Sequence, residues 1–181
     1  MIYVFLASGF EEIEALAAVD ILRREKLDVV TVGVGAKVVT GSHKIPVYCD
    51  VIDCEIYPDE NCTGVVLPGG MPGTLNLEKS QIVQSFIDYA NDKNILIAAI
   101  CAAPSILGHK GLLKGKKAVC FTGYEEQLLG AEVQQSAVCR DGNIITACGV
   151  GAAMKFGLEL VKEYCGIDEM KRLEAAMLCD R

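Results

Sequence analysis

The chain has 181 residues, 51% of them hydrophobic, and its 24 acidic side chains outnumber 17 basic ones to give a formal net charge of −7. This length predicts one domain spanning residues 1–181, and the hydrophobic fraction excludes an intrinsically disordered chain. An acidic chain without a block of basic residues is not expected to bind nucleic acid independently of sequence, because such binding requires Lys and Arg to neutralise phosphates.

Nothing in the sequence indicates export or membrane insertion. The N-terminal run MIYVFLASGF has no positively charged leader, and it is short for the apolar part of a signal peptide. The longest apolar run, residues 95–107, is interrupted by Pro104 and falls short of the ~20 residues that a membrane-spanning helix needs. We therefore expect a cytoplasmic protein that makes no membrane contact.

The N-terminal third predicts a strand, a helix and further strands. Residues 2–7 are apolar, and Ser8 with Glu11 three positions later has the spacing of a capping box, so a helix should begin near there. The predicted buried face of this helix consists of Ile13, Leu16, Ala17 and Ile21. The runs DVVTVGV, KVVTGS and KIPVYC predict three strands, the last two as an addition at the sheet edge, where Pro46 is tolerated.

The rest of the chain continues the alternation of strands and helices. GVVLPGG predicts a buried strand that ends in a tight turn, and residues 80–93 predict an amphipathic helix capped by Ser80. ILIAAI predicts another buried strand, followed by a helix to about Leu112 and a strand at KKAVCF. Asp141-Gly142 between two apolar runs predicts a hairpin, and two helical segments, residues 151–164 and 168–178, close the chain.

Strands that are almost continuously apolar and alternate with helices indicate a parallel sheet covered on both faces. The sequence therefore predicts a doubly wound α/β sandwich with a small antiparallel addition. In such a sheet, ligands bind beyond the carboxyl ends of the strands. Three predicted strand ends carry polar or glycine-rich residues: Ser8 to Glu14 after the first strand, Gly69-Gly70 after VVLP, and Cys101 after ILIAAI.

Cys101 is the one cysteine of nine that this rule selects. The nine have no CxxC spacing and no export signal precedes them, so neither a disulfide framework nor a metal site is expected, and most are predicted to be small buried hydrophobic residues. A residue just before a helix lies beside unpaired N–H groups, which favour the nucleophilic thiolate. The alternative is a core cysteine at the end of a buried strand.

Glu14, Gly69 and Gly70 each have a structural and a functional interpretation. Glu14 is either a solvated carboxylate in the first helical turn or a buried acid whose raised pKa lets it donate to Cys101 or relay a proton. The glycine pair is either a plain turn or a backbone donor site, in which the N–H groups of Gly70 and Ala102 bind a substrate oxygen. The remaining polar candidates are interpreted structurally: Glu11 and Glu12 as capping and surface residues, His109 at a helix end, and His43 in a loop.

Three motifs, GFEEIEA, VVLPGGMPG and AAICAAPSIL, together with GNIITACGVGAAMKFGLELV, resemble the ThiJ/PfpI superfamily, in the branch of the parkinsonism-associated protein DJ-one and its bacterial relatives. The resemblance implies a flavodoxin-like homodimer with Cys101 as reactive cysteine, Glu14 as its partner carboxylate, and Gly70 and Ala102 as backbone donors. It further implies a cofactor-free enzyme that converts methylglyoxal to lactate or removes early glycation adducts. The alternative that it implies is an oxidative-stress sensor acting through a Cys101 sulfinate.

The sequence departs from the family pattern in two places. Phe121 or a neighbour stands where some members have a histidine near the cysteine, so a Cys-Glu mechanism must suffice and amide hydrolysis is disfavoured. The usual SRGPG becomes ACGVG, with Cys148 for arginine and Val150 for proline, which puts the arginine's role in anion binding or in the dimer contact in doubt here.

Overall fold

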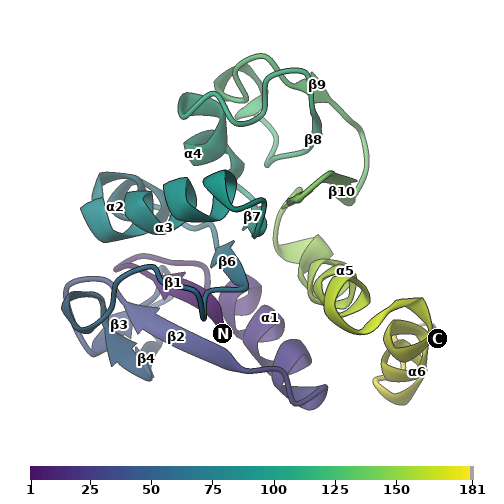
Figure 1. The fold of residues 1–181 in the computed structure, drawn as a ribbon, viewed down its shortest axis with the longest axis horizontal. Coiled ribbons are helices and arrows are strands. Elements are labelled where there is room, and N and C mark those ends of the chain that lie inside the picture. Colours follow the sequence, from purple (N-terminus) through teal and green to yellow (C-terminus); the bar gives the residue numbers. More distant parts are fainter. Residues whose placement is uncertain (180–181) are drawn as a thin grey trace.

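The computed structural model describes residues 1–179. Its centre is a seven-stranded sheet with the order β10-β11-β7-β6-β1-β2-β5 (Figure 1). The strands are, in chain order, β1 (Ile2–Leu6), β2 (Val29–Gly33), β5 (Val51–Ile52), β6 (Gly64–Leu67), β7 (Leu96–Ile100), β10 (Val138–Asp141) and β11 (Ile144–Ala147). All neighbours pair in parallel except β10 and β11, which form the predicted antiparallel hairpin. The mostly parallel sheet confirms the predicted flavodoxin-like class.

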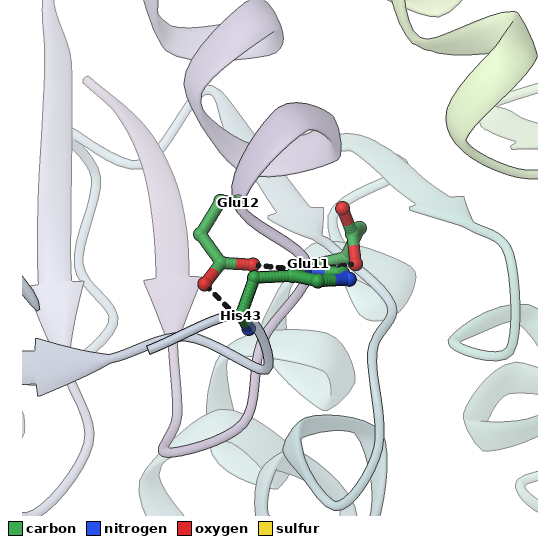
Figure 2. A group of neighbouring side chains, drawn as sticks. All are labelled: Glu11, Glu12 and His43. Carbon is green, nitrogen blue, oxygen red and sulfur yellow. Dashed lines mark hydrogen bonds and ion pairs between the residues drawn. The ribbon is translucent and has the colours of Figure 1, made fainter. Parts of the chain in front are cut away.

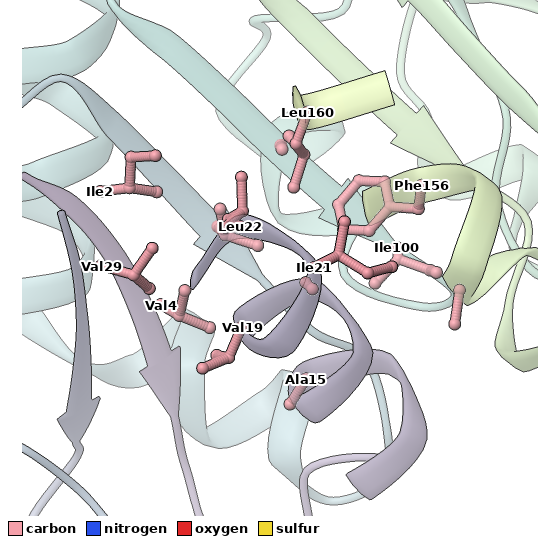
Figure 3. Close-up of a cluster of buried hydrophobic side chains, with 14 of the residues drawn as sticks. Ile2, Val4, Ala15, Val19, Ile21, Leu22, Val29, Ile100, Phe156 and Leu160 are labelled. Carbon is pink, nitrogen blue, oxygen red and sulfur yellow. The ribbon is translucent and has the colours of Figure 1, made fainter. Parts of the chain in front are cut away.

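Helices cover both faces of this sheet. One face packs against α1 (Glu12–Arg24), α5 (Ala153–Cys165) and α6 (Ile167–Ala176), and the other against α2 (Gly73–Lys79), α3 (Gln81–Asp92) and α4 (Pro104–His109). The strand period of two explains the division, because Val4 in β1 points into the first layer while Phe5 points into the second. Figure 3 shows the first layer, in which Ile21 of α1 lies beside Phe156 of α5.

The first helix differs from its prediction in both start and orientation. Gly9, in the left-handed region at φ +85, and a turn closed by the N–H of Phe10 on the carbonyl of Ala7 keep the chain non-helical up to Glu11. Ser8 is therefore no cap, and the side chain of the N-cap residue Glu11 makes no capping hydrogen bond. Of the predicted buried face only Ile21 is buried, since Ile13 is 55% exposed, Leu16 is 37% exposed and Ala17 is partly buried. The buried face consists of Glu12, Glu14, Ala15, Ala18, Val19, Ile21 and Leu22.

Two predicted strand regions lie outside the central sheet. The strands β3 (Val38–Thr40) and β4 (Pro46–Tyr48) exist but pair only with each other, as an antiparallel hairpin. KKAVCF contributes only β8 (Lys117–Ala118), which pairs with β9 (Glu132–Val133). The N–H of Val119 donates to Thr146 Oγ1 of β11 at 2.9 Å, so a side chain takes the place of a ladder bond there.

The helices after Lys79 mostly follow their predictions. Ser80 caps α3 as predicted, with its side chain accepting from the N–H of Val83. Helix α4 ends at His109 rather than near Leu112, because Gly111 adopts φ +75 and turns the chain away. No helix within residues 1–179 is long and apolar enough to cross a membrane.

Gly157 allows close packing of α5 against α1. A Cβ at this position would lie 2.5 Å from Ile21 Cδ1 and 3.1 Å from Ile21 Cβ. We expect Gly157→Ala to lower the free energy of unfolding by about 1 kcal/mol, because overpacking at about 1–3 kcal/mol outweighs a gain in helix propensity of about 1 kcal/mol. Urea denaturation measures the change. The control is Gly151→Ala, whose Cβ would meet no atom within 4 Å; an equal loss in both variants would contradict the packing explanation.

Candidate active site

The predicted convergence of three strand ends is present in the structure. In the sheet, β6 lies between β7 and β1, so the segments that follow these three strands are neighbours. They supply Cys101 after β7, the pair Gly69-Gly70 after β6, and Glu14 in the first turn of α1. The backbone links two of them directly, since the N–H of Glu11 donates to the carbonyl of Gly69 at 2.9 Å.

Cys101 is held in a backbone conformation that non-glycine residues rarely adopt. Its φ is +65, in the left-handed region, which costs roughly 1–2 kcal/mol for an ordinary side chain. Hydrogen bonds fix both of its backbone groups: its N–H donates to the carbonyl of Ala147 at 2.9 Å, and its carbonyl accepts from the N–H of Phe121 at 2.7 Å. Backbone strain of this kind gathers at functional sites, where the surrounding structure imposes it.

Backbone N–H groups lie beside the Cys101 sulfur. The N–H groups of Gly70 and Ala102 are close enough for each to lower the pKa of the thiol. Gly70 has φ +90, and a Cβ there would lie 2.5 Å from the carbonyl oxygen of Gly9. Only glycine therefore brings this N–H so close to the sulfur. A Cβ at Gly69 would likewise lie 2.6 Å from Cys101 Cβ and 2.7 Å from Glu14 Oε2.

Glu14 is completely buried beside the cysteine, so its interpretation as a solvated helix carboxylate is wrong. Its Oε2 accepts from the N–H of Gly69 at 2.9 Å, and the carboxyl group lies close enough to the Cys101 thiol for each group to shift the pKa of the other. Its Oε1 is buried without a hydrogen-bond partner among residues 1–179. Burial raises the pKa of Glu14 to about 7, and the nearby Glu11 charge acts in the same direction.

The cysteine and the carboxyl group titrate as a pair. Burial first, and then the facing Glu14 charge, raise the pKa of Cys101 to about 12 in spite of the two N–H groups. The expectation of an acidic thiol is therefore wrong as long as Glu14 is ionised, because the local sequence reveals the N–H groups but not the burial. Since two adjacent anions are unfavourable in this buried place, the pair keeps one proton near neutral pH. A sulfur that attacks an electrophile must leave this proton on Glu14.

Glu11 and Glu12 are buried, which corrects their interpretation as surface residues. Figure 2 shows both carboxylates beside His43, from the loop between β3 and β4. Glu12 accepts from the backbone N–H of His43 at 2.8 Å and contacts His43 Nδ1 at 3.0 Å, while Glu11 Oε2 accepts from the Ser42 hydroxyl at 3.1 Å. Ligand atoms of the two glutamates and His43 lie within 4.8 Å of one another, a spacing that could hold a metal ion. The hydrogen bonds to the loop account for the cluster without one.

Both histidines of the chain are paired with glutamates other than Glu14. His109 ends α4, as predicted, and its Nδ1 contacts Glu78 Oε1 at 2.5 Å, while His43 is paired with Glu12. Phe121 is half-exposed beside Gly149, and Cys148 is half-buried with its N–H donating to the carbonyl of Ala137. From the sequence, Phe121 and Cys148 are recognisable only as departures from a family pattern. Their positions beside the site could not be predicted from local sequence, because both depend on contacts between distant segments.

All nine cysteines are free thiols. Only Cys49, Cys62 and Cys120 are buried, so the prediction that most of the nine are buried is wrong, and burial raises the pKa of each of these three. Cys54 and Cys179 are exposed. Cys101 differs from all of these because a buried carboxyl group and two backbone N–H groups act on its thiol.

The fold and this arrangement define a class of protein, an α/β sandwich with a cysteine at a strand end paired to a buried carboxyl group. The profile of the DJ-1/PfpI family matches residues 1–163, and the chain belongs to that family. Protein dj-1beta of Drosophila melanogaster is 33% identical over 178 residues, covering 97% of this chain and 95% of that protein. Deglycase PfpI of Pyrococcus furiosus is 30% identical over 159 residues, covering 86% of this chain and 94% of that protein. The solved structure of oxidized Toxoplasma gondii DJ-1 superposes with a TM-score of 0.93 at 30% identity, covering 98% of this chain and 97% of that one.

Proposed function

We propose that this protein is a cysteine-dependent enzyme that needs no cofactor and acts on small α-oxoaldehydes, with methylglyoxal converted to lactate, or on their early glycation adducts. The observation that carries the proposal is the Cys101–Glu14 pair facing the N–H groups of Gly70 and Ala102. A relative named a deglycase supports an activity on glycation adducts as the second form of the same chemistry.

The first chemical step is attack of the Cys101 sulfur on the aldehyde carbon. Glu14 accepts the thiol proton as the S–C bond forms, and the aldehyde oxygen, as it becomes an oxyanion, accepts hydrogen bonds from the N–H groups of Gly70 and Ala102. Protonation of this oxygen gives a hemithioacetal. A pKa of about 7 suits Glu14 to both accept and return a proton near neutral pH.

The second step moves hydrogen within the adduct. Glu14 removes the proton on the former aldehyde carbon, and an enediol forms; the neighbouring ketone carbon then gains a proton, and the product is a thioester of the 2-hydroxy acid. Water cleaves the thioester and restores the thiol. The overall change adds one water to the α-oxoaldehyde, so no oxidant or reductant is consumed.

The direct test is to incubate the pure protein with methylglyoxal and to measure lactate by chromatography, without added glutathione or metal. The proposal requires lactate formation that depends on both Cys101 and Glu14. Equal rates for the native protein and for the Cys101→Ser and Glu14→Gln variants would refute it.

A sensor with negligible turnover is the second candidate, favoured by the same N–H groups. Two molecules of hydrogen peroxide would convert the thiol to a sulfinate and two waters, and the N–H groups of Gly70 and Ala102 with protonated Glu14 would hydrogen bond to the sulfinate oxygens. The raised pKa of Cys101 disfavours this candidate, because peroxide reacts with the thiolate. Peptide mass spectrometry after mild peroxide treatment tests it: uniform oxidation of the nine cysteines would count against a tuned sensor.

We further propose that the protein is a homodimer. The outward face of α1 carries Ile13 and Leu16, and α5, which packs beside α1, carries exposed Met154 in its first turn and follows exposed Val150. Apolar side chains gathered on neighbouring elements are typical of an interface between subunits.

Leu16→Lys is expected to shift a dimer to monomer, because a desolvated ammonium group without a partner destabilises an apolar interface. Sedimentation equilibrium measures the molecular mass. Leu129→Lys, at an exposed apolar residue outside this face, is the matched control; a monomeric native protein, or dissociation of both variants, would refute the assignment of this face.

A further inference from the structure

Phe121 lies at the candidate active site without taking part in the proposed proton transfers. Its N–H donates to the Cys101 carbonyl at 2.7 Å, which fixes its backbone beside the cysteine. Its ring packs on Gly149: a Cβ built on Gly149 would lie 3.2 Å from Phe121 Cδ2 and 3.9 Å from Cys101 Sγ. The ring and the sulfur therefore both approach the position that a side chain of residue 149 would occupy.

The ring is also accessible from outside. Phe121 is 49% exposed, and a half-exposed aromatic ring leaves apolar surface for a ligand to cover. Glu14 and Gly69 already occupy space beside the cysteine, since a Cβ on Gly69 would lie 2.6 Å from Cys101 Cβ and 2.7 Å from Glu14 Oε2. For a substrate attached to Cys101, with its oxygen on the N–H groups of Gly70 and Ala102, we therefore expect the remaining substituent to lie toward Phe121 and Gly149.

Glu14 lies beside Cys101, and its charge raises the pKa of the thiol, as the charge of Glu11 raises the pKa of Glu14. The imidazole of His43 is paired with Glu11 and Glu12, at 3.3 and 3.0 Å. An anionic substituent on a substrate held at Cys101 would therefore be repelled by Glu14 when that carboxyl group is ionised.

We propose that Phe121 is a specificity-determining residue, which selects uncharged α-oxoaldehydes with an apolar or aryl substituent by contact between that substituent and its ring. The reaction in this inference rests on the proposed function, whereas the contact between Phe121 and a group attached to Cys101 does not. An aromatic contact of about 0.5–1.5 kcal/mol corresponds to a preference of roughly two- to tenfold.

The turnover experiment compares kcat/KM for phenylglyoxal and methylglyoxal. We expect the native protein to prefer phenylglyoxal to methylglyoxal. Phe121→Ala should lower the phenylglyoxal-to-methylglyoxal ratio of kcat/KM by about fivefold, mainly through KM, whereas Phe121→Tyr, which keeps an aromatic ring, should retain the native ratio. Tyr57→Ala, at an exposed aromatic residue in another loop, is the matched control. An unchanged ratio in Phe121→Ala, with turnover retained, would overturn the inference and leave the proposed function intact.

A second experiment does not depend on turnover. The rate of Cys101 alkylation is measured by peptide mass spectrometry with iodoacetamide, N-phenyl iodoacetamide and iodoacetate, each relative to free cysteine. We expect the phenyl reagent to be favoured and iodoacetate disfavoured, and Phe121→Ala should remove only the first effect. If this pattern is found but no aldehyde is turned over, the proposed function is refuted while the contact with Phe121 is supported. Equal relative rates for the native protein and Phe121→Ala would overturn the role of Phe121.

Discussion

Replacing Cys101 with serine is expected to lower lactate formation from methylglyoxal by at least about a thousandfold, because the hydroxyl is a far weaker acid and nucleophile than the thiol. The fold should persist, since serine keeps the shape of the side chain and can accept the same N–H groups of Gly70 and Ala102. The measurement is kcat from initial rates at saturating methylglyoxal, with circular dichroism to verify folding.

The control for this variant is Cys54→Ser, which removes an exposed thiol away from the paired residues. It should keep the native rate, and it excludes a general effect of thiol removal. If Cys101→Ser retained more than a tenth of the native kcat, a different residue would have to be the nucleophile.

Glu14→Gln is expected to lower kcat by about 10²- to 10⁴-fold, because the amide cannot accept the thiol proton. In the native protein, kcat/KM should rise with pH through about 7, as the first proton leaves the pair and Glu14 becomes available as a base. The residual kcat/KM of the variant should not show this rise near pH 7. A pH–rate profile of the native protein and the variant from pH 5 to 9 tests both statements, and an identical profile would contradict the role of Glu14.

The same substitution should stabilise the fold at high pH. Below pH 4.5 Glu14 is protonated in both folded and unfolded states and brings no penalty; between 4.5 and about 7 the unfolded chain ionises first, so native stability falls as pH rises. Above pH 7 the penalty is constant at up to about 3 kcal/mol. Urea denaturation at pH 4.5 and pH 8 should therefore show that the free energy of unfolding of Glu14→Gln, relative to that of the native protein, is higher at pH 8 than at pH 4.5. A difference that is independent of pH would show that the pKa of Glu14 is not raised by folding.

The position of Cys101 could be predicted from sequence because the information is local. ILIAAI is a continuously apolar run that ends just before Cys101, and Pro104, three positions after the cysteine, fits the first turn of a helix. The order of apolar strands and helices then identifies the carboxyl end of the sheet as the place of a site. Gly70 followed from the same rule. That residues 1–181 are one domain stays a prediction.

The orientation of α1 could not be predicted in this way. Ile13 and Leu16 have the spacing of a buried face, yet Glu12 and Glu14 are the residues that turn inward. Their partners come from elsewhere in the chain: the loop at His43 binds Glu12, and Gly69 binds Glu14. A periodicity argument counts apolar residues on one helix, so it cannot include hydrogen bonds that other segments donate.

The sequence by itself determined the fold class, the strand that carries Cys101, and the two glycines beside it, because these depend on the pattern of apolar residues and on backbone rules that act over a few residues. Only the tertiary structure decided that Glu14 is buried, that burial raises the pKa of both Glu14 and Cys101, and that the Phe121 ring lies over Gly149 next to the sulfur. Each of these is a contact between segments far apart in the chain. Burial and proximity set the electrostatic free energies, and neither exists until those segments pack together.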